Sequence, residues 1–333
     1  MVVMAQKPPL PSPPAPLPTP AASSSQPNTR ASPTPSSSSS SSYVTNPEEM
    51  KIVVTGSSGS LAEGLIQLVL SATKHSLILV DHKPPPPGSE LDNPRIEYVT
   101  AELRTYTNFL EILTSKRVDA LIHLASYPNP FLAHASEIHN ANVTLSFNAL
   151  QAAVEAGIKR VVMASSVNAT SAAYAFGEPT YDYFPLDEQH PMRPEDAYSL
   201  SKAIMEVQCD AFARFNPEMS IASLRLHHCV NTKKNTSHIV KDARKDLWGY
   251  IMMESAARAC LLALDVPWKG HEVMYVVGNQ HSAQGYNAEE IAKTYFPKTK
   301  RKSGPLAPSQ GFYDCSKAER LIGWKHEGGR MPA

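Results

Sequence analysis

The chain has 333 residues and a formal net charge of zero, from 31 basic and 31 acidic side chains. Such a balance offers no electrostatic footprint for nucleic acid or for an anionic membrane, so a small molecule is the expected partner. No apolar run approaches the roughly 20 residues that a membrane span needs, and the N-terminus lacks the apolar core of a signal peptide. We therefore expect a soluble protein with no nucleic-acid or membrane partner.

Residues 1–46 are dominated by proline, serine, alanine and threonine, and they include an unbroken run from Ser36 to Ser42. Such a segment buries too little apolar surface to offset the entropy of ordering, so we expect a disordered tail. A transit peptide is the alternative, but the proline density disfavours the amphipathic helix that a mitochondrial one would form.

The residues from Met50 to Gly64 read M-K-I-V-V-T-G-S-S-G-S-L-A-E-G. We expect the apolar Lys51–Thr55 stretch to be the buried first strand of a parallel sheet. The two glycines that follow would let backbone N–H groups approach a pyrophosphate, and the next helix, from about Ser60, would offer its partial positive charge to the same group. This pattern predicts a dinucleotide-binding turn, with an ordinary structural turn as the alternative.

Strand and helix signals then alternate along the chain. Strands are expected over Ser76–Asp81, Arg95–Thr100, Val118–Ala125, Arg160–Ser165 and Ile221–Leu226, and helices over Leu61–Ser71, Tyr106–Ser115, Ala135–Ala156 and Ala197–Phe215. This alternation predicts an α/β fold with a doubly wound parallel sheet of the Rossmann type, and with ligands at the carboxyl ends of the strands.

Two domains are expected in the folded part of the chain. Residues 47–230 would form the nucleotide-binding domain, and residues 231–333 would form a small substrate-binding lobe with the C-terminal elements. Within the second part, a helix over Trp248–Leu264 is expected to pack back on the first domain.

Asp81 closes the second predicted strand, 25 residues after Gly56. A carboxylate at this place can accept both ribose hydroxyls of the adenosine half and would repel a 2′-phosphate, so it favours NAD over NADP. The alternative is a solvated loop aspartate, with His82 and Lys83 holding a phosphate instead.

Tyr198 and Lys202 lie four residues apart, which places both side chains on one helix face. There the ammonium group can lower the phenol's pKa from about 10 towards the operating pH, which would make a general base. The pair follows a predicted strand that ends in Ala164-Ser165-Ser166.

Several of these motifs together resemble the extended short-chain dehydrogenase/reductase family. T-G-S-S-G-S-L-A is similar to the family's T-G-x-x-G-x-x-G turn, with Ala62 at the third glycine position. The double serine at 165–166, the Y-S-L-S-K sequence at 198–202 and the closing S-K-A-E-R-L-I-G-W at 316–324 also resemble family motifs. The resemblance covers nearly all of residues 50–325.

The resemblance implies a catalytic triad in which Ser166 steadies the substrate oxygen, Tyr198 exchanges its proton, and Lys202 lowers the phenol's pKa and bonds the nicotinamide ribose. His123 is left as an ordinary strand-end histidine, and Glu102 is one methylene longer than the family's usual aspartate. The implied cofactor contacts are Gly56, Ser58, Gly59, Ser60, Leu61, Asp81, Glu102, Leu103, Leu124, Ala125, Ser126, Asn142, Tyr198 and Lys202.

The departures from the family's pattern concern the substrate. Asn168 follows the catalytic serine region where the family's 4,6-dehydratases carry acidic residues, and the V-Y-G segment is replaced by residues 169–173. His228 stands where the family usually has an asparagine facing the substrate. A metal site at His227, His228 and Cys229 is disfavoured because adjacent strand residues point to opposite faces, so no metal is expected.

Only 17 residues (231–247) separate Val230 from Trp248, which is shorter than the insertion that nucleotide-sugar enzymes of this family use. The pattern is nearest to the uronate dehydrogenase branch. We therefore expect an NAD-dependent oxidoreductase acting on a hydroxyl of a small, sugar-derived substrate, with Asn168 and His228 as substrate contacts. The alternatives are a sugar epimerase that uses NAD transiently and a dinucleotide sensor without catalysis. A homodimer is expected through the helices near 142–156 and 197–215.

Overall fold

The computed structural model describes residues 49–85, 93–170, 173–231, 243–265, 268–283 and 285–326. All of them belong to one compact unit, Thr45–Ala333. The predicted disordered tail lies outside the described residues, as does most of the 231–247 segment. None of the described helices is both long and apolar enough to cross a membrane.

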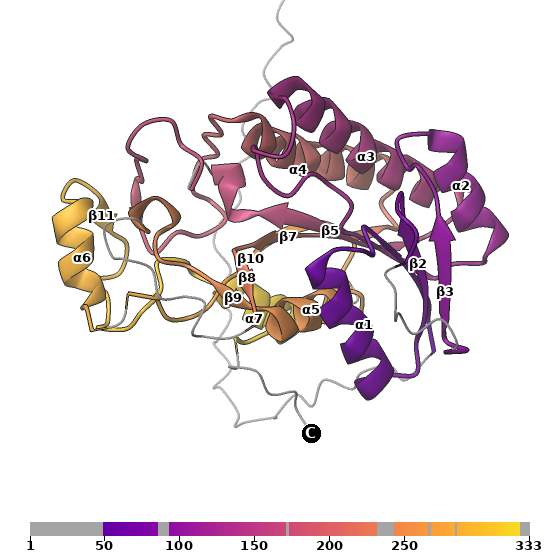
Figure 1. Ribbon diagram of the computed structural model, residues 1–333. Helices are drawn as coiled ribbons and strands as arrows, with labels where there is room; N and C mark the ends of the chain where they lie inside the picture. Colours follow the sequence, from indigo (N-terminus) through magenta and orange to yellow (C-terminus); the bar gives the residue numbers. More distant parts are fainter. Residues whose placement is uncertain are drawn as a thin grey trace, which may run out of the picture. The chain divides into compact units, whose positions relative to one another are not determined.

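The described residues form a central sheet of seven parallel strands in the order β10-β7-β5-β4-β1-β2-β3 (Figure 1). The chain leaves β1 in one direction to build β2 and β3 and then returns to build the other half, so the order reverses between β1 and β4. In doubly wound sheets this switch point is where ligands bind. The strands are β1 Lys51–Thr55, β2 Ser76–Asp81, β3 Ile96–Thr100, β4 Ala120–His123, β5 Arg160–Ser166, β7 Ser220–Leu226 and β10 Gly270–Val276.

Helices cover both faces of this sheet (Figure 1). Alternate residues of a strand point to opposite faces, so Ile52 and Val54 of β1 pack with α1, α5 and α7, while Val53 packs with α2, α3 and α4. The predicted Rossmann-type architecture is confirmed. The helices are α1 Ser60–Ala72, α2 Tyr106–Ser115, α3 Ala135–Glu155, α4 Ala197–Phe215, α5 Met253–Leu262, α6 Ala288–Tyr295 and α7 Ser316–Ile322.

A smaller lobe is built on an aromatic cluster that includes Phe184, Trp248, Phe296 and Phe312. Two short strand pairs accompany it, β6 Tyr183–Phe184 with β11 Lys300–Arg301, and β8 Cys229–Val230 with β9 Ile251–Met252. The short helical turns η1 Val167–Thr170 and η3 Arg244–Asp246 complete the described elements.

The C-terminal third differs from the prediction in two respects. The expected helix over Trp248–Leu264 begins only at Met253, because Leu247 and Trp248 have positive φ angles of 54° and 51° and Trp248 is buried in the aromatic cluster. The strand β10 is also part of the central sheet, beside β7. The predicted boundary after residue 230 therefore does not separate the central sheet from the lobe. The aromatic cluster of the lobe contains residues from before and after this position.

The helix α5 packs against α1. A Cβ added at Gly64 of α1 would lie 3.0 Å from the Met253 side chain, so the two helices approach closely at this glycine. Ala62, at the family's third glycine position, is fully buried in the core cluster that also contains residues of α5.

Candidate active site

The glycine turn after β1 lies against the chain that leaves β4. Gly56 has φ +70°, and a Cβ there would lie 2.7 Å from the backbone nitrogen of Ala125 and 2.9 Å from the carbonyl carbon of Leu124. Because backbone atoms cannot move aside as a flexible side chain can, this position requires glycine. The turn is thereby fixed at the switch point of the sheet.

Helix α1 begins directly at this turn. Gly59 is its N-cap residue, and the N–H of Glu63 makes a first intrahelical bond to the Gly59 carbonyl at 3.1 Å. The N–H groups of Ser60 and Leu61 precede that bond, and such groups at a helix N-terminus are suited to an anion. The predicted phosphate-binding residues are thus brought together as a turn and a helix start.

Asp81 is buried at the end of β2, and its carboxylate is turned towards the glycine turn. Its Oδ2 accepts a hydrogen bond from the Ser58 N–H at 3.0 Å, and its Oδ1 accepts one from the Lys83 N–H at 3.1 Å. Nδ1 of the exposed His82 lies 2.9 Å from the same Oδ1. A carboxylate has about four lone-pair sites, so acceptor capacity remains for a ligand hydroxyl. This placement favours the binding role over a solvated loop aspartate.

Tyr198 and Lys202 lie in the first two turns of α4 and are both buried. The helix is capped by Asp196, whose Oδ1 accepts from the N–H groups of Tyr198 at 2.9 Å and Ser199 at 3.0 Å. The Lys202 Nζ lies 5.7 Å from the centre of the Tyr198 ring, and Ser166 is close enough to act on the pKa of the Tyr198 phenol. The structure therefore brings the predicted triad together.

The ionisation of this pair differs from the simple expectation. Burial raises the pKa of the Tyr198 phenol above its ordinary value, with the hydrogen bond from Ser166 acting in the opposite direction. Burial also lowers the pKa of Lys202 to about 8, against the effect of the Glu206 carboxylate. Among the protein's own groups, desolvation rather than the lysine charge dominates the phenol's pKa. At neutral pH the phenol is protonated and the ammonium is charged.

The residues after β4 connect the glycine turn to the triad. Ala125 N–H donates to Thr55 Oγ1 at 3.3 Å, and Ser126 Oγ accepts from Lys202 Nζ at 3.1 Å. The third member of the predicted segment, Leu124, donates its N–H to the Thr55 carbonyl at 3.2 Å. The segment 124–126 thus lies between the proposed phosphate site and the catalytic lysine.

His123 is a buried strand-end histidine. Its Nδ1 lies 2.9 Å from Thr55 Oγ1, and burial together with the Lys202 charge lowers its pKa to about 3. The ring is therefore neutral at physiological pH, which agrees with its omission from the predicted contacts.

Asn142 of α3 has several protein partners. Its Oδ1 accepts from the Tyr127 N–H at 2.8 Å, and its Nδ2 donates to the Tyr127 carbonyl at 3.2 Å and to Ser201 Oγ at 3.0 Å. These bonds fasten the loop after β4 to α4. Its predicted cofactor contact stays a prediction, while the observed bonds give it a positioning role.

The predicted cofactor contacts after β3, Glu102 and Leu103, have protein partners of their own. Glu102 is turned to Arg104, with 2.7 Å between its Oε2 and Nη2, and is 40% exposed. Leu103 is buried, and its carbonyl accepts from Asn148 Nδ2 at 2.9 Å. The surface pairing of Glu102 leaves its contact with a nucleotide a prediction.

The two predicted substrate contacts have different surroundings. Asn168 is buried and donates to Ser166 Oγ from its backbone N–H at 3.1 Å and from its Nδ2 at 3.3 Å, so it holds the Ser166 hydroxyl. His228 is exposed, whereas its neighbour His227 is buried with Nε2 2.9 Å from the Asp246 carbonyl. The two histidines therefore occupy different environments.

Tyr174 is a further residue at the site, and no sequence motif indicated it. Its ring packs edge-on against Tyr198, with 5.8 Å between ring centres, and Phe131 packs edge-on against Tyr174 at 5.5 Å. Tyr174 comes from the segment that follows the replaced V-Y-G residues, where no spacing rule applies. Glu206, by contrast, could have been found from its spacing of four residues after Lys202.

Comparison with known proteins agrees with this geometry. A uronate dehydrogenase of Pseudomonas putida is 25% identical over 268 residues, covering 77% of this chain and 90% of its own. A Methanocaldococcus jannaschii protein provisionally named a UDP-glucose 4-epimerase is 24% identical over 306 residues, covering 83% of this chain and 93% of its own. The structure of a UDP-glucose 4-epimerase from Thermotoga maritima superimposes with a TM-score of 0.61 at 18% identity, covering 84% and 94% of the two chains.

The family model described as the NAD dependent epimerase/dehydratase family matches residues 52–278. This range runs from β1 to the residues just after β10, and so includes the glycine turn, Asp81 and all three triad residues. The chain therefore belongs to the NAD-dependent epimerase/dehydratase family, within the extended short-chain dehydrogenases/reductases.

Proposed function

We propose that the protein is an NAD-dependent oxidoreductase that takes hydride from a hydroxyl-bearing carbon of a small, sugar-derived substrate. The observation that carries this proposal is the meeting of Ser166, Tyr198 and Lys202, all buried, at the carboxyl end of the sheet. A buried phenol beside a buried ammonium is suited to exchanging a proton with a substrate oxygen.

The residues of the switch point fit a dinucleotide. The N–H groups at the start of α1 would bind the pyrophosphate, Asp81 would accept the adenosine ribose hydroxyls, and Lys202 would bond the second ribose. Because Asp81 carries a negative charge in a buried place, NAD is preferred over NADP. Bound NAD would supply the hydride acceptor and a cationic ring whose charge favours the ionised phenol.

The chain's own residues would then handle the proton. Ser166 Oγ donates a hydrogen bond to the substrate oxygen, and the Tyr198 phenolate takes the hydroxyl proton as the C–H hydride leaves and the carbonyl forms. The Lys202 ammonium stabilises the phenolate by its charge. Because the protonated phenol can give its proton to a carbonyl oxygen, the same residues also serve the reverse reaction.

An epimerase that uses NAD only transiently is the second candidate, since relatives of this chain carry that name. It would make no net NADH and would retain its cofactor. A non-catalytic dinucleotide sensor is disfavoured, because a sensor needs no Ser166, Tyr198 and Lys202 arrangement. The short 231–247 segment favours a free sugar or sugar acid over a nucleotide sugar as substrate.

The test is a substrate screen with the purified protein. Uronic acids, aldoses and small alcohols are each mixed with NAD, and absorbance at the NADH wavelength is followed. We expect a sustained rise with at least one free sugar or sugar acid. Cofactor that stays with the protein through gel filtration, together with interconversion of epimers and no net NADH, would replace this proposal with the epimerase.

The assembly we propose is a homodimer formed through α3 and α4. These helices lie side by side on one face of the sheet (Figure 1), and their outer surface carries Phe147, Leu200 and Val207, which are 47%, 42% and 56% exposed. Apolar side chains at adjoining positions suit a four-helix interface around a two-fold axis.

A cytoplasmic location is supported by the four cysteines, all of which are free thiols.

A further inference from the structure

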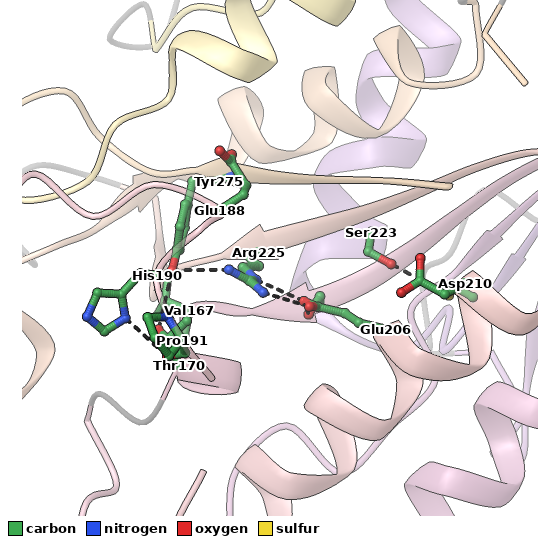
Figure 2. Close-up of polar contacts among 12 residues, drawn as sticks. Val167, Thr170, Glu188, His190, Pro191, Glu206, Asp210, Ser223, Arg225 and Tyr275 are labelled. Atoms are coloured by element: carbon green, nitrogen blue, oxygen red, sulfur yellow. Dashed lines mark hydrogen bonds and ion pairs between the residues drawn. The ribbon is translucent and has the colours of Figure 1, made fainter. Parts of the chain in front are cut away.

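A buried ion pair joins α4 to β7 (Figure 2). Glu206 of α4 and Arg225 of β7 are joined by two hydrogen bonds, Nε to Oε1 at 2.9 Å and Nη2 to Oε2 at 2.7 Å. Both side chains are only 3% exposed. Burial acts to lower the pKa of Arg225, but Glu206 and Tyr275 together outweigh burial and raise that pKa above its ordinary value.

The pair is linked to three further elements. Ser165 Oγ of β5 donates to Glu206 Oε1 at 2.6 Å. The Arg225 guanidinium lies 5.2 Å from the centre of the Tyr275 ring of β10, and its Nη1 donates to the Tyr275 hydroxyl at 3.4 Å. That hydroxyl lies 3.3 Å from Thr170 Oγ1 of η1. The network therefore fastens α4 to the three strands β5, β7 and β10 and to the turn that follows Ser166.

Glu206 lies on the same helix as two of the three triad residues. Glu206 lies four residues after Lys202 and eight after Tyr198, so the three side chains share one face of α4. Ser165 immediately precedes Ser166 on β5. A single carboxylate thus faces the catalytic ammonium along the helix and at the same time bonds the strand end that carries the catalytic serine.

Stability alone is a weak reason for such a pair. Removing two charges from water is costly, and well-packed apolar residues of similar volume often stabilise a core as well or better. We infer that Glu206, held by Arg225, is a positioning residue for catalysis: it keeps the Lys202 ammonium charged and fixes the end of β5 that carries Ser166. The inference rests on the proposed function for its catalytic half, whereas the charge on Lys202 can be measured without a substrate.

The other groups around Lys202 do not provide this charge. From β4 and the segment after it come the neutral His123, whose pKa is about 3, and the Ser126 hydroxyl. From β5 comes the Ala164 carbonyl, which accepts from Nζ at 2.8 Å. The Tyr198 phenol is protonated at neutral pH, and Glu206 is the carboxylate that acts on the lysine.

The experiment is an NMR titration of the full-length protein with 13C-labelled lysine, in which the Lys202 signal is identified by its loss in Lys202→Met. In the native protein we expect half-titration near pH 8. In Glu206→Gln it should move to lower pH, because burial then acts without an opposing carboxylate. The matched control is Ser223→Ala, which removes a buried hydroxyl two residues from Arg225 that bonds His271 and Cys209 instead.

Ser165→Ala separates the two halves of the inference, because it removes the bond to β5 and keeps the charge of Glu206. We expect a native Lys202 titration and, with the substrate found by the screen, a fall in turnover of about tenfold or more. Native turnover in this variant would overturn the positioning of Ser166.

The effect of Glu206 on the charge of Lys202 is tested separately. If Glu206→Gln fails to fold, Glu206→Gln combined with Arg225→Met leaves no unpaired buried charge, and the Lys202 titration should still move to lower pH. An unchanged titration in the variant that folds would overturn the inference. That result differs from failure of the proposed function, which would appear as unchanged turnover in Tyr198→Phe while the Lys202 titration still responds to Glu206.

Discussion

Replacement of Gly56 by alanine gives a quantitative test of the nucleotide-binding turn. Gly56 has φ +70°, and an added Cβ would lie 2.7 and 2.8 Å from the backbone nitrogen and Cα of Ala125. Gly157, after α3, has a similar φ of +74° but open space around an added Cβ. The two sites share the backbone penalty, about 1–2 kcal/mol, and only Gly56→Ala adds a clash with backbone.

We therefore expect Gly157→Ala to lower Tm by a few degrees, at roughly 2–4 °C per kcal/mol for a protein of this size. Gly56→Ala should cost about 1–3 kcal/mol more, since overpacking forces the backbone to shift. It should also weaken NADH binding, measured by fluorescence titration, whereas Gly157→Ala should bind NADH normally. Equal Tm losses in the two variants with native NADH affinity in both would refute the argument that the turn must approach β4 so closely.

Three further predictions concern the cofactor, pH and assembly. The native protein should bind NADH at least about tenfold more tightly than NADPH, and Asp81→Ala should bring the two dissociation constants close together; a native preference for NADPH would mean that His82 and Lys83 govern the site. The pKa of His123 is about 3 in the folded protein and about 6.5 in the unfolded chain. The free energy of unfolding should therefore fall by about 1.4 kcal/mol per pH unit below pH 6.5 through this residue. In denaturant melts between pH 6.5 and 5, the free energy of unfolding of His123→Asn should fall less steeply than that of the native protein. Equal slopes would argue against a buried neutral ring. Light scattering should find a native dimer at micromolar concentration and a monomer for Leu200→Glu with Val207→Asp, and a native monomer would contradict the α3–α4 interface.

Much of the fold follows from local sequence pattern. The first strands are short apolar runs between turn signals, so their positions are predicted to within one or two residues. The strand β10 was not predicted from the sequence. It is an edge strand, and its first half is only partly buried and includes His271 and Glu272, so it lacks a continuous apolar run. The predicted start of helix α5 at Trp248 is too early, because an apolar residue there fits a helical pattern. In the structure the Trp248 ring is buried in the aromatic cluster and the backbone is left-handed at this residue, which helix propensity does not indicate.

Some residues of the site can likewise be predicted from the sequence, and others become neighbours only in the fold. Tyr198 and Lys202 are found by their spacing, because residues four apart on a helix lie on one face, whereas Ser166 is found only by its resemblance to the family's double serine. Glu206, Arg225 and Tyr275 come from α4, β7 and β10, and only the sheet order makes them neighbours. The ligand contacts of Asn168 and Asn142 stay predictions, and their observed bonds hold Ser166 and the loop after β4, a positioning role that a motif match does not indicate.

In the proposed reaction Tyr198 exchanges the proton of the substrate oxygen. Tyr198→Phe removes the phenol oxygen and keeps the ring that packs against Tyr174. With the substrate found by the screen, single-turnover and steady-state measurements should show turnover reduced by about two to four orders of magnitude. The dissociation constant for NADH should stay close to the native value. Native turnover in this variant, with the protein folded and NADH bound, would contradict the account.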